Sequence, residues 1–145
     1  MIALLQRVNW AKVSIAQVQH AAIARGLLVF VGIEKNDTDA SASKLLDKVL
    51  TLRIFSDAAG KMNLDLREVA GELMLVSQFT LAATTDKGLR PGFSSAMPPT
   101  EAQALYEFLL RTATARHAVV QSGQFGADMQ IALENDGPVT FILKS

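Results

Sequence analysis

The residues best suited to chemistry follow an apolar run, residues 73–76, in the stretch Ser77-Gln78-Phe79-Thr80. Loops that follow buried strands are where binding and catalytic groups concentrate. Thr80 is the candidate nucleophile, but a threonine hydroxyl needs an adjacent base to become reactive. The Gln78 amide cannot transfer protons, although it can orient a ligand through its donors and its acceptor. The stretch therefore predicts either an activated threonine or a cradle that positions a substrate.

The sequence places no base beside Thr80. Of the two histidines, His20 lies in a predicted hairpin turn and His117 follows a predicted helix. Thr80 is not an N-terminal residue, so its own α-amine cannot act as the base. Two roles for Thr80 stay open on these grounds: a nucleophile, and a hydroxyl that bonds to the backbone of its turn.

A second stretch with chemical potential spans residues 135–140 and contains Gly137-Pro138. A Gly-Pro pair is typical of a turn. An X-Pro bond is also the peptide bond in which the cis isomer costs least. A cis bond can turn two neighbouring carbonyls the same way and so form a rigid pair of acceptors. The sequence does not determine which isomer is present.

Composition excludes several kinds of site. The chain has no cysteine, which excludes disulfides, zinc-thiolate sites and thiol nucleophiles. Neither a metal-binding spacing, a Walker loop nor a dinucleotide fingerprint is present, so we expect no metal and no cofactor. The formal net charge is zero, which argues against holding nucleic acid by bulk charge. Lys87 and Arg90 either contact a phosphate or carboxylate locally or are solvated loop charges.

Length and hydrophobicity predict one domain over residues 1–145, with apolar residues enough for a sizeable core. The first residues lack the pattern of a signal peptide. The longest apolar run, residues 27–31, is too short to cross a bilayer. We expect a cytoplasmic protein with no membrane partner.

The elements that must position these residues can be predicted from hydrophobic spacing. Asn9-Trp10 is predicted as a turn or bulge between the first two strands, and residues 56–63 as a loop. Gly26 precedes the most continuous apolar run, which is typical of a buried strand. Seven segments are predicted as strands: residues 2–8, 12–18, 27–33, 72–76, 119–121, 129–133 and 139–143.

Two helices are predicted from apolar residues at helical spacing. The first begins after Asp37-Thr38-Asp39, which supplies an N-cap. The second follows Pro98-Pro99, where Thr100 and Gln103 form a capping-box pattern. The order ββ(βα)2βββ predicts a layered α/β domain with its helices on one side. Because so few helices leave apolar sheet surface uncovered, we expect a homodimer.

These motifs resemble the D-aminoacyl-tRNA deacylase family over essentially the full length of the chain. The most specific blocks are residues 77–80 and 135–140, and further blocks are residues 53–57, 60–64 and 127–130. The resemblance implies a three-layer α/β/β domain and a homodimer. It also implies a hydrolase that acts on the ester bond of D-aminoacyl-tRNA and of glycyl-tRNA mischarged on tRNA-Ala. The partner would be the 3′ acceptor end of tRNA, with no role for DNA.

The resemblance also implies roles for individual residues. The catalytic motif matches Ser77, Gln78, Phe79 and Thr80. The Gly-cisPro motif, which enters the active site of the partner subunit and rejects L-amino acids, matches Gly137 and Pro138. The substrate- and adenosine-binding positions match Phe125, Met129, Val139 and Thr140.

This resemblance accounts for the missing base. The ester of an aminoacyl-tRNA is already activated, and the vicinal ribose hydroxyl can help to activate water. The protein then needs only to position the ester and stabilise the oxyanion, and backbone N–H groups at Phe79 and Thr80 are candidates. Two alternatives stay open: a threonine-dependent esterase or amidase acting on a small free substrate, and a non-catalytic homodimer that binds RNA ends or nucleotides.

Overall fold

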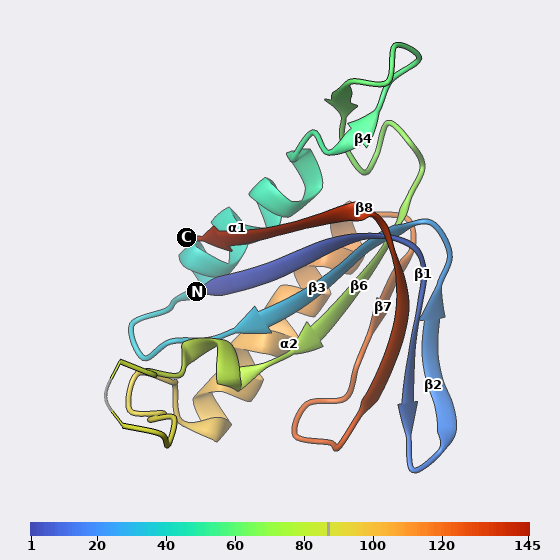
Figure 1. Cartoon of the computed structure of the whole chain (residues 1–145). Helices are drawn as coiled ribbons and strands as arrows, with labels where there is room; N and C mark the ends of the chain where they lie inside the picture. The colour runs from blue at the N-terminus through green and yellow to red at the C-terminus, as the bar shows by residue number, and fades with distance from the viewer. Residues whose placement is uncertain (87) are drawn as a thin grey trace.

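The structure is a computed structural model that describes residues 1–86 and 88–145. Its elements follow the chain in this order: β1 (Ile2–Ile15), β2 (Val18–Ile23), β3 (Gly26–Gly32), α1 (Asp39–Thr51), β4 (Phe55–Ser56), β5 (Met62–Leu64), β6 (Glu72–Ser77), η1 (Phe79–Ala82), α2 (Pro99–Arg116), β7 (Val120–Ser122) and β8 (Gln130–Lys144). Figure 1 shows their arrangement. No helix in the described part of the chain is both long and apolar enough to cross a membrane.

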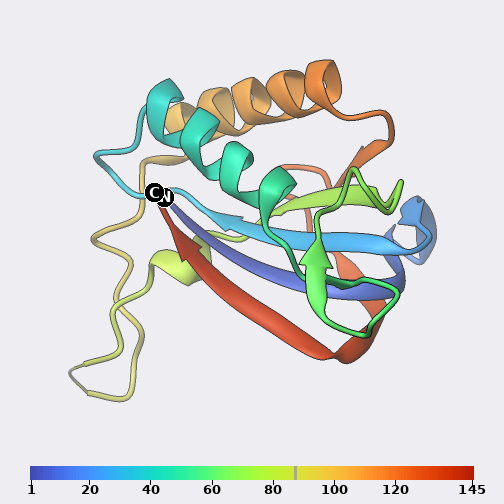
Figure 2. The ribbon, with the colours of Figure 1, turned by 90° about the horizontal axis from the view of Figure 1, so that it is seen from above.

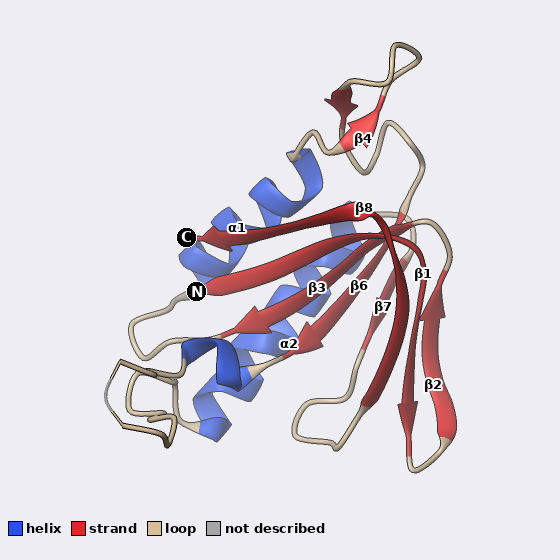
Figure 3. Cartoon of the chain, viewed as in Figure 1, coloured by secondary structure: helices blue, strands red, loops and turns tan. Residues whose placement is uncertain are grey.

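Six strands form one curled sheet, and β4 and β5 form a small separate hairpin (Figure 3). The main sheet has the order β2-β1-β3-β6-β7, and β8 pairs with β1 along almost all of its length. The first half of β1 pairs with β3 and the second half with β2. The sheet curls so far that β2 approaches β6 and β7, which makes it barrel-like.

Helices α1 and α2 lie side by side on one face of this sheet (Figure 2). They cover a core that includes Leu5, Val29 and Leu75. A second cluster, with Val13, Leu28 and Met74, fills the inside of the curl. Because successive residues of a strand point to opposite faces, these two clusters account for the nearly continuous apolar runs of β3 and β6. The predicted mixed α/β fold with helices on one side is confirmed.

The predicted start of the chain is partly wrong. Residues 2–15 form one strand rather than two, and Asn9-Trp10 is an irregularity in its pairing with β8. The bulge alternative was therefore right and the turn alternative wrong. The chain turns at Ala16 and Gln17, both of which have positive φ. The prediction missed β2, which places His20 in a strand rather than in a turn.

The predicted end of the chain is also partly wrong. Segments 129–133 and 139–143 are halves of one strand, β8, because both pair with β1 on either side of a register shift. Asn135 spans the bend between them, since its side-chain oxygen accepts a hydrogen bond from the Val139 N–H at 2.7 Å. The segment predicted as a loop, residues 56–63, contains parts of the β4–β5 hairpin.

The two helices begin differently. The predicted cap segment Asp37-Thr38-Asp39 does cap α1: Thr38 is the N-cap residue, in a reciprocal capping box with Ser41. The predicted capping box of Thr100 and Gln103 is wrong, because α2 begins at Pro99 and has no side-chain cap. Proline suits the first helical position, since it lacks the N–H that would otherwise need a partner there. The apolar residues at helical spacing in α2 are buried: Ala102, Leu105, Tyr106, Leu109 and Ala113.

Candidate functional site

The candidate site is a hollow of about 680 Å³ at the carboxyl ends of β3 and β6. These strands are parallel and in register from Gly26 opposite Glu72 to Val31 opposite Ser77, so both end at the same edge of the sheet. Ligands of α/β sheets bind at this edge. The walls come from four segments far apart in the sequence: the end of β3, residues 76–79, residues 93–99 with the first turn of α2, and residues 125–131.

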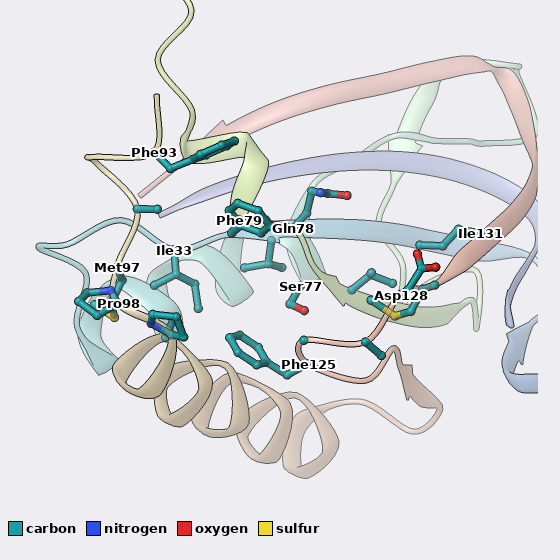
Figure 4. A pocket seen from close by; sticks show the side chains of 18 residues that line it. Ile33, Ser77, Gln78, Phe79, Phe93, Met97, Pro98, Phe125, Asp128 and Ile131 are labelled. Carbon is teal, nitrogen blue, oxygen red and sulfur yellow. The ribbon is translucent and has the colours of Figure 1, made fainter. Parts of the chain in front are cut away.

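The predicted motif lies on one wall of the hollow. Ser77 is the last residue of β6, and its hydroxyl points into the hollow (Figure 4). Phe79 begins η1, is 60% exposed, and lies against Phe93 with ring centroids 5.0 Å apart. The Gln78 amide donates to the Thr80 hydroxyl at 2.5 Å. Thr80 is not a lining residue, so the hydroxyl predicted as nucleophile is a neighbour of the hollow, held by Gln78.

The backbone of η1 offers hydrogen-bond donors at this wall. The Gln78 N–H donates to the Val31 carbonyl at 2.7 Å, and the Leu81 N–H donates to the Gln78 carbonyl at 3.1 Å. The first N–H groups of a helix have no partner within the helix. The N–H groups of Phe79 and Thr80, which the sequence singled out, are therefore the donors available at this turn.

Ionisable groups are scarce around the hollow. Among the described lining residues, Asp128 has the one ionisable side chain. Both histidines lie elsewhere: His20 is exposed on β2, and a ring nitrogen of His117 lies 2.8 Å from the Gly71 carbonyl. Arg90 is exposed in the hairpin closed by backbone bonds between Thr84 and Gly92, and Lys87 lies outside the described residues.

The far wall contains two of the four residues predicted for substrate and adenosine binding. Phe125 and Met129 both line the hollow, and the Phe125 ring lies 6.0 Å from that of Tyr106. The Tyr106 hydroxyl donates to the Leu75 carbonyl at 2.8 Å, and burial raises its pKa. Because Tyr106 is fixed in the core by this bond, it provides a rigid support for Phe125.

Gly123 sets the position of Met129. A Cβ added at Gly123 would lie 2.6 Å from the Met129 sulfur, so any side chain there must displace the thioether. We expect Gly123→Ala to raise KM for the substrate of this hollow about tenfold with little change in melting temperature, because only a flexible side chain moves. Steady-state kinetics with thermal unfolding checks this. An unchanged KM would show that Met129 does not contact the substrate.

The second predicted motif lies outside the hollow of its own chain. Gly137 and Pro138 are exposed at the bend of β8, and the peptide bond between them is cis. Val139 is buried, and Thr140 bonds to Gln6 and Asn135. None of these four residues from Gly137 to Thr140 is a described lining residue. A single chain therefore brings Ser77, Gln78 and Phe79 together with Phe125 and Met129, but not with Gly137 and Pro138.

Arg7 is a residue of this region that the sequence did not indicate. Its side chain is buried, and its guanidinium donates to the carbonyls of Asp136 and Ile54 at 3.0 and 2.5 Å. It also pairs with the Asp136 carboxylate at 3.1 Å. Arginine holds several acceptors in fixed geometry through its planar fork, so Arg7 makes the bend before Gly137 rigid. The one indication of Arg7 in the sequence is that it is a lone charged residue within the apolar strand predicted over residues 2–8.

Other lining residues were also absent from the predicted site. Phe93, Met97 and Asp128 line the hollow without having been singled out individually. The signals available were modest: Phe93 lies in the Gly- and Pro-rich stretch after Thr80, and Asp128 precedes Met129 in a recognised block.

Comparisons by sequence and by structure find proteins that are similar to this chain over nearly its full length. The family model described as D-Tyr-tRNA(Tyr) deacylase matches residues 4–144. The D-aminoacyl-tRNA deacylases of Pseudomonas fluorescens and Pseudomonas syringae pv. tomato are 56% and 58% identical, each over the full length of both chains. A solved structure titled c-Myc DNA Unwinding Element Binding Protein has a TM-score of 0.94 and 38% identity, covering 100% of this chain and 99% of that chain. A probable eukaryotic D-amino acid tRNA deacylase, 18% identical, has the same fold with a TM-score of 0.87, covering 99% of this chain and 98% of the other.

Proposed function

The chain belongs to the D-aminoacyl-tRNA deacylase family and hydrolyses the ester of D-aminoacyl-tRNA, and from this premise we propose that a second copy of the chain completes its active site. In this proposal, Gly137 and Pro138 of each chain face the hollow of the other and exclude L-amino acids. The observation that carries it is the separation of the two motifs, since neither residue lines the hollow of its own chain. A symmetric dimer forms two such composite sites.

The sheet offers a surface for this dimer. Leu4 lies opposite Phe30 on one side and opposite Ile142 on the other. Residues paired in this way share a face of the sheet, and Leu5, the next residue, belongs to the core under the helices. The face formed by Leu4, Phe30 and Ile142 is therefore the one that the helices leave open, and Ile142 is 65% exposed on it.

The chemistry at each site would be positioning rather than nucleophilic catalysis. The terminal adenosine would enter the hollow between Phe125 and Met129, placing the ester near Ser77 and η1. The N–H groups of Phe79 and Thr80 would stabilise the oxyanion, and one such donor contributes about 10²–10³ in rate. The vicinal ribose hydroxyl of the substrate would help to activate water. The absence of a histidine from the described lining residues supports this assistance by the substrate.

Chirality would be read by backbone groups. Carbonyls of the partner's Gly137-Pro138 would accept the substrate ammonium and occupy the space that an L side chain needs. A D side chain would point outward, so its identity would matter little. Glycine has no side chain to exclude, so glycyl-tRNA mischarged on tRNA-Ala would also be hydrolysed. In addition, we propose that residues 1–145 form one three-layer α/β/β domain, supported by the two hydrophobic clusters on opposite faces of the sheet.

Matched substrates test this proposal. We expect the purified protein to hydrolyse D-tyrosyl-tRNA and glycyl-tRNA rapidly and to leave L-tyrosyl-tRNA at its spontaneous rate. A D-aminoacyl ester of a small alcohol should not react, because the ribose hydroxyl and the adenosine are missing. Equal rates on D- and L-tyrosyl-tRNA would contradict the chiral filter, and rapid hydrolysis of the small ester would contradict substrate assistance.

Thr80 provides a second test of the mechanism. We expect Thr80→Ala to keep activity within about tenfold of the wild type, because the hydroxyl accepts a hydrogen bond from Gln78 and does not attack the ester. Thr114→Ala, which removes an exposed hydroxyl bonded to the Leu110 carbonyl, is the matched control. A loss of about 10⁴ in kcat with the fold intact would instead identify Thr80 as the nucleophile.

A further inference from the structure

Among the described lining residues of the hollow, Asp128 has a charged side chain whose role the reaction does not explain. Asp128 is exposed, and it also lines a shallower hollow beside the turn between β1 and β2, next to Gln17 and Gln130. Figure 4 shows its carboxylate beside Ile131, at the end of the main hollow away from Met97 and Pro98. The two hollows therefore meet at Asp128.

The Asp128 carboxylate has no partner among the residues that the structure describes. In residues 1–86 and 88–145 it takes part in neither a salt bridge nor a hydrogen bond. A carboxylate at the mouth of a tRNA site is unfavourable beside phosphates, because like charges repel. It becomes favourable where the substrate presents an N–H donor. The N–H donors at the end of an aminoacyl-tRNA are the exocyclic amines of its last bases and the ammonium of its amino acid.

We propose that Asp128 is a specificity residue, whose carboxylate accepts a hydrogen bond from the exocyclic amine of a base at the 3′ end of the tRNA. This inference rests on the proposed function, which places the terminal adenosine in the main hollow. Adenine carries such an amine at N6, and the preceding cytosine carries one at N4. A carboxylate side chain accepts from a base amine in direct readout of nucleic acids. The shallower hollow gives the preceding nucleotide a place beside the same carboxylate.

The preference for one kind of base should reverse when the Asp128 carboxylate is replaced by an amide. Inosine in place of adenosine, or uracil in place of cytosine, presents a carbonyl oxygen where the amine was. The wild-type carboxylate repels that oxygen, whereas the amide of Asp128→Asn can donate to it. We therefore expect the wild type to prefer the amine-bearing base, and Asp128→Asn to prefer the carbonyl-bearing base.

The experiment measures kcat/KM on three D-tyrosyl-tRNAs: one with the natural CCA end, one ending in inosine, and one with the preceding cytosine replaced by uracil. We expect the wild type to lose about tenfold on one of the two altered ends, which identifies the base. Asp128→Asn should lose about tenfold on the natural end and recover on that same altered end. Glu101→Gln, an exposed charge change in the first turn of α2, should behave as the wild type.

Three outcomes would overturn the inference. Equal kcat/KM of the wild type on all three ends would show that no base amine is read. A loss of about 10³ or more in kcat by Asp128→Asn on every substrate would make Asp128 a general base. Loss of the Asp128→Asn effect on N-acetyl-D-tyrosyl-tRNA would assign the carboxylate to the ammonium. Wild-type hydrolysis of D- over L-tyrosyl-tRNA in the same assay tests the proposed function separately.

Discussion

Ile142→Glu is expected to convert the protein to a monomer and to reduce deacylation of D-tyrosyl-tRNA by at least about a hundredfold. The substitution places a carboxylate on the open face beside Leu4, and each buried, unpaired charge costs several kcal/mol. A twofold interface buries this charge twice. The chain itself should fold normally, because Ile142 is 65% exposed within it. Light scattering, thermal unfolding and single-turnover hydrolysis measure the three effects.

Val18→Glu is the matched control for this substitution. Val18 is 70% exposed on β2, which pairs with residues 11–15 of β1 rather than with the half that contains Leu4. It therefore receives the same charge on an equally accessible branched residue away from Leu4, Phe30 and Ile142. We expect it to remain dimeric and active. A monomeric Ile142→Glu protein with full activity would show that one chain contains a complete site, and a dimeric one with full activity would place the interface elsewhere.

Gly137→Ala is expected to lower the preference for D- over L-tyrosyl-tRNA by about a hundredfold, since a displacement near 1 Å in a positioned group costs that much. Gly137 has φ of +147°, and an added Cβ would lie 2.6 Å from the Val139 side chain and 2.7 Å from its backbone nitrogen. The backbone must shift, and with it the carbonyls that face the partner's hollow. Hydrolysis of the L ester should rise while that of the D ester falls.

Gly60→Ala separates this effect from general strain. Gly60 also has a positive φ, +77°, but an added Cβ there meets no atom within 4 Å, and the residue lies outside both parts of the proposed site. We expect a modest loss of stability with the D preference unchanged. Retention of the full D preference by Gly137→Ala would remove Gly137 from the chiral filter.

Local chemistry made part of the fold predictable. Thr38 and Ser41 lie within one turn, so their capping box follows from neighbouring residues. The lengths of β1 and β8 depend instead on distant partners: β1 continues past Asn9-Trp10 because β8 pairs with it on both sides of that irregularity. Sequence spacing indicated a break where tertiary pairing keeps the strand continuous.

The site was predictable to a similar extent. Residues 77–79 line the hollow because they end a buried parallel strand, as their position indicated. The roles of Phe93 and Asp128 depend on a hollow assembled from four separate segments, which no local pattern encodes. The role of Arg7 was not predictable for the same reason, since its partners, Ile54 and Asp136, are distant in sequence. The roles assigned to Gly137 and Pro138 stay predictions, because they depend on a second chain.

Subunit complementation tests the composite site most directly. Ser77→Trp should fill the hollow into which the Ser77 hydroxyl points, and Pro138→Trp should block the hollow of the facing chain. Each homodimer is then inactive. Coexpression with two affinity tags isolates the heterodimer, which keeps one unmodified hollow facing one unmodified Gly137-Pro138. We predict about half of the wild-type activity on D-tyrosyl-tRNA from this heterodimer. An inactive heterodimer, or a fully active Pro138→Trp homodimer, would contradict a site shared between two chains.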